Sequence, residues 1–186
     1  MGLDISAYRR LLGNPVPPPA DMDFTGPYLA ANEEAFPNHM GSAKPGLYKG
    51  AVEQMGFRAG SYSGYNDWRE WLAQLAGYKP VIVPAGEKIG MLNHADRRHS
   101  YSAGAWAVDS GPFHELINFS DCEGTIGPEI AAKLAQDFKD FQAFVDNPEP
   151  GKPYYEAMCM SWYAEAYGLW RVAFEMAKDG GAVCFH

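Results

Sequence analysis

The chain has 186 residues, of which 47% are hydrophobic and 14% are aromatic, so it is long and apolar enough to bury the core of one globular domain. Its formal net charge of −8 disfavours duplex nucleic acid as a partner, because affinity for duplexes comes from cations that neutralise phosphates. Three widely spaced cysteines, no run of 18 apolar residues and no apolar signal core predict a cytoplasmic protein with no membrane partner.

An alternating pattern of apolar and polar residues predicts a half-buried strand over residues 3–7. The composition then shifts to Pro, Gly and Asn over residues 13–46, which indicates a long loop inserted into the domain. Residues 47–59 are expected to form a strand or a hairpin. A helix is predicted over residues 65–76, because apolar residues recur there at helical spacing and Gly77 follows as a stop signal.

Residues 81–83 are predicted to form a short buried strand, whereas residues 89–112 show no clear periodicity. A further strand is expected over residues 116–119, where an apolar run leads into a polar loop. The last predicted elements are a helix over residues 128–145, a helix over residues 153–178 and a strand over residues 182–185.

Strands and helices alternate along the chain without a regular βαβ repeat, which favours the α+β class. We expect a single domain over residues 1–186, with the Pro- and Gly-rich insertion at about residues 13–46. Its core should be a small mixed or antiparallel sheet packed against about three helices.

The first candidate site is the polar, glycine-containing loop before the helix predicted at Pro128. A helix N-terminus has N–H groups without partners and a partial positive charge, so this loop can receive a phosphate or a carboxylate. The candidate ligand-binding residues here are Asp121, Glu123, Thr125 and Gly127. Two alternatives stay open: the loop only caps the helix, or Asp121 and Glu123 bind a metal or perform acid–base chemistry.

The second candidate site is the segment FRAGSYSGYN, which also leads from a strand into a helix. An arginine can pair with phosphate, serines supply hydroxyl groups and tyrosines offer flat faces for a base. The candidate residues are Arg58, Ser61, Tyr62, Ser63 and Tyr65. The alternative is an ordinary loop in which Ser63 caps the following helix. No phosphate-loop signature such as GxxxxGK[ST] or GxGxxG occurs.

The third candidate site is the segment NHADRRHS. His94 and His99, with Asp96 between them, have residue types that bind metals. Arg97 and Arg98 form a locally basic spot that can contact an anion. A solvent-exposed loop without a ligand is the remaining interpretation.

Four sequence blocks together mark a resemblance. They are MGLDISAY, GFRAGSYSGYNDWREWLAQLAG, PFHELINFSDCEGTIGPEIAAKLAQDF and the closing GGAVCFH. The chain resembles, outside its Pro-rich insertion, a family of small proteins found in phages, prophages and bacterial genomes. The resemblance implies an accessory, phage-type role in the host cytosol, where such acidic proteins bind host proteins or sequester nucleotide signals of host defence. It supplies no catalytic residue.

The leading hypothesis is a non-enzymatic protein that binds a small phosphorylated, nucleotide-like ligand without a further cofactor. The first and second candidate sites are expected to form two walls of one hollow, with Arg97 or Arg98 adding positive charge. One alternative is a metal-dependent hydrolase of a nucleotide-like substrate that uses Asp121, Glu123, His94 and His99. Another is an inhibitor that binds a host enzyme as its protein partner. Aromatic residues on the last helix also suggest a homo-oligomer.

Overall fold

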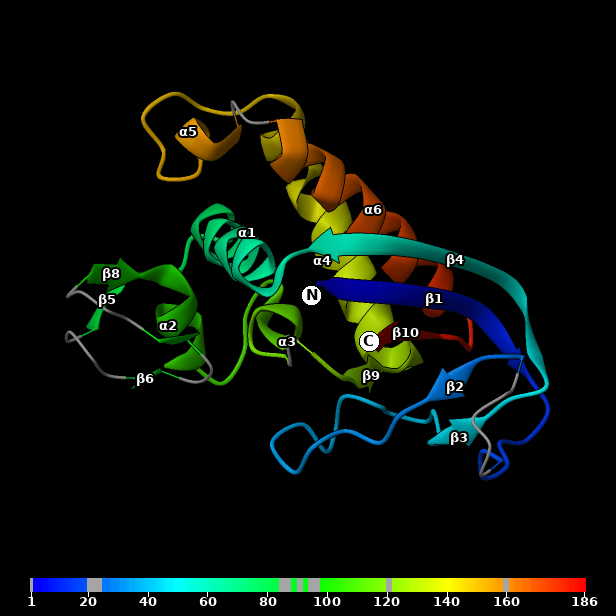
Figure 1. Cartoon of the computed structure of the whole chain (residues 1–186). Coiled ribbons are helices and arrows are strands. Elements are labelled where there is room, and N and C mark those ends of the chain that lie inside the picture. The colour runs from blue at the N-terminus through cyan, green and yellow to red at the C-terminus, as the bar shows by residue number, and fades with distance from the viewer. Residues whose placement is uncertain are drawn as a thin grey trace.

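Four antiparallel strands form the central sheet, in the order β4-β1-β10-β9 (Figure 1). They are β1 (Leu3–Leu12), β4 (Gly50–Gly60), β9 (Gly124–Ile126) and β10 (Ala182–Phe185). The computed structural model describes residues 2–19, 25–83, 88–89, 92–93, 98–119, 122–158 and 161–186. The sheet and the helices packed against it confirm the predicted α+β class.

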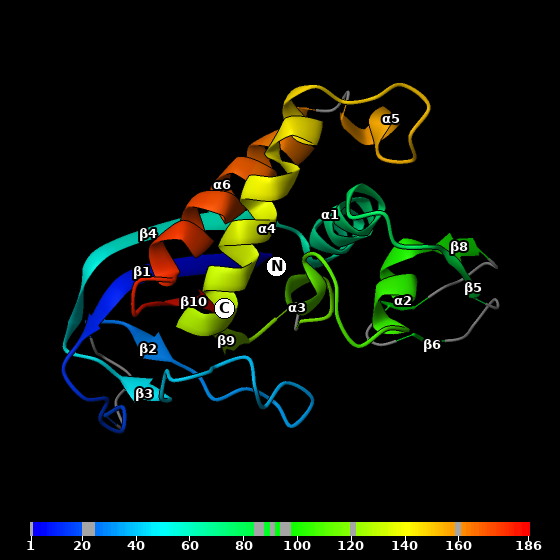
Figure 2. The same ribbon diagram turned by 180° about the vertical axis from the view of Figure 1, so that it is seen from behind.

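Two long antiparallel helices cover one face of this sheet (Figure 2). They are α4 (Pro128–Asp146) and α6 (Ser161–Ala177). Pro128 and Glu129 open α4, in agreement with the preference of proline for the first turn and of acidic residues for the positive helix end. The predicted helix over residues 128–145 is confirmed.

The other helices lie beside the sheet or at the far end of the long pair. They are α1 (Tyr62–Leu75), α2 (Tyr101–Trp106), α3 (His114–Ile117) and α5 (Tyr155–Met158). The remaining strands are β2 (Tyr28–Leu29), β3 (Gly46–Leu47), β5 (Val81–Val83), β6 (Lys88–Ile89), β7 (Leu92–Asn93) and β8 (Arg98–Ser100). They form the pairs β2–β3, β5–β8 and β6–β7.

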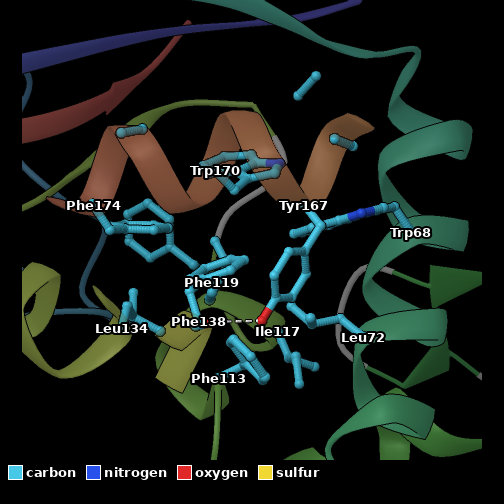
Figure 3. Close-up of a cluster of buried hydrophobic side chains, with 14 of the residues drawn as sticks. Trp68, Leu72, Phe113, Ile117, Phe119, Leu134, Phe138, Tyr167, Trp170 and Phe174 are labelled. Atoms are coloured by element: carbon cyan, nitrogen blue, oxygen red, sulfur yellow. Dashed lines mark hydrogen bonds between the residues drawn. The ribbon is translucent and has the colours of Figure 1, made fainter. Parts of the chain in front are cut away.

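Aromatic side chains build the core between the sheet, α1 and α6 (Figure 3). The Trp170 ring of α6 stacks on that of Trp68 at 5.7 Å between centroids and lies 5.4 Å from that of Phe185 on β10. The buried Tyr167 hydroxyl donates to the Phe138 carbonyl of α4 at 2.6 Å. Aromatic pairs contribute about 0.5–1.5 kcal/mol beyond the hydrophobic energy of the area that they bury. This cluster therefore fixes how α1 and α6 pack on the sheet.

The Pro-rich insertion folds over the outer face of the sheet rather than extending into solvent. Leu29, Met40 and Tyr48 are buried in a small second core that includes Tyr8 of β1 and Cys184 of β10. In its described part, the insertion contains two-residue strands and irregular backbone, in agreement with the predicted long loop. It therefore covers the outer face over β9 and β10 and around Tyr8 of β1.

The strand predicted over residues 116–119 is wrong, because residues 114–117 form the short helix α3. A run of a few apolar residues fits a buried strand and a buried helical turn equally well, so tertiary contacts decide between them. Here the buried Arg69 guanidinium donates to the carbonyls of Ile117, at 3.1 Å, and Phe119, at 2.5 Å. This cation satisfies carbonyls where the short helix ends, a position that favours positive charge.

The helix predicted over residues 153–178 is described as two helices, α5 and α6, and residues 159–160 between them lie outside the described residues. The ambiguous stretch 89–112 contains β8 and α2. The N-terminus of α2 receives the carboxylate of Glu70, which accepts hydrogen bonds from the backbone N–H groups of Tyr101 at 2.6 Å and Ser102 at 2.9 Å.

Candidate functional site

The first and second candidate sites reach the same end of the sheet. Gly60 pairs with Leu3, and Gly124 pairs with Phe185, so the ends of β4 and β9 that carry these loops point the same way. However, β1 and β10 lie between them in the strand order. Three strand spacings of about 4.8 Å separate the two loops by roughly 14 Å. They therefore flank the sheet end and do not face each other directly.

The residues of the second candidate site have mainly structural contacts. Ser61, rather than Ser63, caps α1: its hydroxyl accepts from the N–H of Gly64 at 3.0 Å. Tyr65 is buried, and its ring stacks on that of Trp170 at 5.7 Å. Its face is therefore used by the core rather than by a ligand.

Three further residues of this site remain at the surface or near it. Arg58 is exposed, and its guanidinium lies against the backbone of Gly2. Tyr62 is half-buried and packs against the core, and Ser63 is exposed, with its hydroxyl 3.1 Å from that of Ser61. Of this set, Arg58 is the group best placed to meet an anion.

The polar groups of Thr125 are used inside the protein. Its hydroxyl is fully buried and donates to the Ala30 carbonyl at 2.9 Å, and its N–H donates to Oδ1 of Asn32 at 2.6 Å. Residues of the insertion thus use the hydrogen-bonding groups of Thr125 that were expected to contact a ligand. Glu123, close by, is exposed.

The N-terminus of α4 is also covered by the insertion. The N–H of Gly127, the residue before the helix, donates to the His39 carbonyl at 2.8 Å, and a side chain at Gly127 would clash with the Met40 carbonyl. The N–H of Ser42 donates to Oε2 of Glu129 at 2.9 Å. Backbone of the same chain therefore takes the space that an anion was expected to fill.

Several predicted residues lie outside the described residues. They are His94, Asp96, Arg97 and Asp121. For Arg98 the backbone alone is described, as part of β8, and His99 is exposed on the same strand. Within the described ranges, no three His, Cys, Asp or Glu side chains gather closely enough to hold a metal ion.

A basic groove lies elsewhere, between α4, α6 and the end of β1, with a volume of about 570 Å³. Its cationic residues are Arg9, Lys139, Arg171 and Lys178, and its one carboxylate is that of Glu175. Its apolar residues are Ala132, Ala135, Val172 and Met176. Pockets for small ligands have volumes of about 300–1,000 Å³ and combine apolar walls with a few placed polar groups, as this groove does.

The cations of the basic groove differ in how far they are neutralised. Arg9 pairs with Glu53 across the sheet at 3.4 Å, and Lys178 pairs with Glu175 at 2.5 Å. Lys139 and Arg171 form no ion pair with any carboxylate in the described part of the chain, and both are exposed. An anion entering the groove meets these two charges without displacing an internal partner.

The basic groove was not predicted, because its residues lie outside the glycine-containing loops that form the first two candidate sites. A signal was present: Arg171, Glu175 and Lys178 follow at spacings of four and three, which places them on one face of a helix. That these residues approach Arg9 depends on the packing of α6 on β1, which periodicity does not reveal.

Comparison of the chain with protein-family models, with curated proteins and with solved structures gives no match. The resemblance to small phage-type proteins therefore stays a prediction. Among the described helices, none combines the length and apolarity needed to cross a bilayer.

Proposed function

We propose that this protein binds a small phosphorylated, nucleotide-like ligand in the basic groove between α4 and α6. The supporting observation is the concentration of four cations against one carboxylate in a chain of net charge −8. Phosphate oxygens pair well with Arg and Lys donors, and the planar guanidinium of Arg171 can donate two parallel hydrogen bonds.

The apolar residues of the groove support the proposal that the ligand carries a nucleobase. Val172 is 44% exposed on α6, next to the largely buried Met176. A nucleobase has a flat apolar face, and a flexible methionine adapts to such faces. A ligand with both a phosphate and a base would thus satisfy the cations and cover Val172. In the phage-type context that the sequence blocks imply, such binding would sequester a nucleotide signal.

Calorimetric titration with nucleoside mono-, di- and triphosphates and with cyclic dinucleotides tests the proposal. At least one of these should bind, and Lys139→Ala and Arg171→Ala should each weaken it about tenfold, or ~1.4 kcal/mol. Lys49→Ala is the matched control, because Lys49 is exposed and lies outside the groove. Its affinity should equal that of the unmodified protein.

Arg58→Ala separates the basic groove from the end of the sheet, where the loops of the first and second candidate sites lie. If binding occurs in the groove, this variant binds normally. Loss of binding in Arg58→Ala with normal binding in Lys139→Ala and Arg171→Ala would move the site to the sheet end. Absence of binding by every nucleotide tested would remove the proposal.

A further inference from the structure

A second polar constellation lies on the outer face of the sheet, remote in the fold from the basic groove. Residues of β1 alternate between faces, so Leu3 and Ile5 point into the core and Ser6 points outward. The pairing of β1 with β10 continues beyond the strand, because the N–H of His186 donates to the Asp4 carbonyl at 2.9 Å. This register brings Nε2 of His186 to 3.1 Å from the Ser6 hydroxyl oxygen.

The Ser6 hydroxyl opens onto a groove. This groove has a volume of about 350 Å³ and is lined by Ser6, Tyr8, Gln54, Met55 and Gly56. Gly56 is the Cα partner of Ser6 on β4, and a Cβ there would meet only the Ile5 carbonyl, at 3.5 Å. The missing side chain leaves room beside the hydroxyl for a small molecule.

Two carboxylates flank the imidazole of His186. Asp4 neighbours it through the strand pairing, and Glu123 precedes β9 on its other side. Loss of hydration lowers the pKa of His186, although both carboxylates act in the opposite direction. The ring is thus neutral at pH 7 and can accept a proton, and the carboxylates favour the imidazolium that would then form.

We propose that Ser6 and His186 form a nucleophilic dyad that cleaves small carboxylic esters bound in the groove of Tyr8, Gln54 and Gly56. The Ser6 oxygen bonds to the acyl carbon while Nε2 of His186 takes the hydroxyl proton. The bond from the acyl carbon to the ester oxygen then breaks, and that oxygen leaves with the proton from His186. Water, deprotonated by the same nitrogen, releases the acid from Ser6 and restores the hydroxyl.

Two groups beside Ser6 can stabilise the negative charge that develops on the acyl oxygen. Tyr8 and Gln54 are directly opposed in the β1–β4 register and line the same groove. Burial raises the pKa of Tyr8, which keeps its hydroxyl a hydrogen-bond donor. The Gln54 amide is a second donor.

The experiment treats the full-length protein with a fluorophosphonate probe and locates the adduct by peptide mass spectrometry. We expect one adduct per chain, on Ser6, and slow hydrolysis of p-nitrophenyl acetate. Ser6→Ala should remove both, and His186→Gln should slow labelling at least tenfold. Ser63→Ala is the control, because Ser63 is exposed and contacts a serine rather than a histidine.

Circular dichroism and thermal melting verify that each variant is folded. If His186→Gln does not fold, labelling of the unmodified protein still tests the proposal. The probe must then label Ser6 in preference to Ser61 and Ser63. Absence of an adduct on Ser6, equal labelling of exposed serines, or an unchanged rate in folded His186→Gln would overturn the proposal. Ser6→Ala should bind nucleotides normally, because Ser6 does not line the basic groove. Nucleotide titration of this variant therefore distinguishes a failure of the esterase proposal from a failure of the nucleotide-binding proposal.

Discussion

Single buried or partly buried polar residues hold the irregular parts of this protein in place. Arg69 and Glu70 are neighbours on α1, yet they serve different segments: Arg69 binds carbonyls at the end of α3, and Glu70 binds the start of α2. Neither role is visible in the sequence, because the segments that these two residues hold lie about 30 to 50 positions further along the chain. A buried charge of this kind is stable only when donors or acceptors surround it.

We predict that Glu70→Gln lowers the free energy of unfolding by about 1–3 kcal/mol, the typical cost of weakening charge-assisted hydrogen bonds in a partly buried site. An amide retains one acceptor oxygen but places an NH₂ group against backbone N–H donors. Glu70 also accepts from the Ser100 hydroxyl at 3.1 Å, so several bonds are affected. Urea unfolding followed by circular dichroism measures the change.

Glu165→Gln is the control for this substitution, because Glu165 is exposed on α6. Its stability should stay within about 0.5 kcal/mol of the unmodified protein, as for most surface changes. Equal stabilities of the two variants would show that Glu70 does not anchor α2.

At the scale of elements, prediction succeeded where local signals were redundant. For α4, proline and glutamate at the start, an apolar stripe and the prolines at 148 and 150 all agree. The helix α3 has only four residues, and its helical conformation depends on a tertiary contact with Arg69. The strand predicted there was therefore wrong. The same limit applied to the candidate sites: the helix start at Pro128 was predicted, but not the insertion that covers it.

The contact between the insertion and α4 should depend on pH through Glu129. Hydrogen bonds from Ser42 hold the pKa of Glu129 below its ordinary value of 4.5. A lowered pKa in the folded state means that the contact stabilises the fold above pH 4.5 and loses this effect as the pH falls through the lowered value. Glu129 is exposed, so the effect on global stability should be small.

Hydrogen exchange of the Ser42 amide is the measurement for this pH dependence. Its protection, corrected for the intrinsic exchange rate, should decrease below pH 4.5 and should be low at every pH in Glu129→Gln. Protection that does not change between pH 6 and pH 3 would contradict a role for the Glu129 carboxylate. The N–H of Gly127, bonded to a carbonyl rather than a carboxylate, serves as the internal reference.

On the scale of the whole molecule, the local charge of the basic groove is opposite in sign to the net charge of the chain. The net charge of −8 repels anions at long range, whereas the basic groove attracts them at short range. Composition alone revealed the first property and hid the second, because residues at positions 9, 139 and 171 meet only after α4 and α6 pack on the sheet. The α+β class, in contrast, followed from the order of the elements.

Nucleotide binding in the basic groove should therefore weaken with salt. Screening acts on the exposed pairs between phosphate and Lys139 or Arg171, and the Debye length falls from about 10 Å at 0.1 M to about 3 Å at 1 M. We expect about a tenfold loss of affinity between 0.05 and 0.5 M KCl in calorimetric titration, and a smaller salt effect in Arg171→Ala. An affinity that increases with salt would mean that the overall negative charge dominates.

The insertion that covers part of the outer sheet face limits how this architecture can be shortened. Removing residues 25–48 would leave Tyr8, Ala182 and Cys184 in contact with water, and these side chains now form the inner wall of the second core. A minimised variant would therefore have to replace them with polar residues to remain monodisperse. Ser6 and Gly56 would need no such redesign, since neither residue belongs to the second core in the described part of the chain.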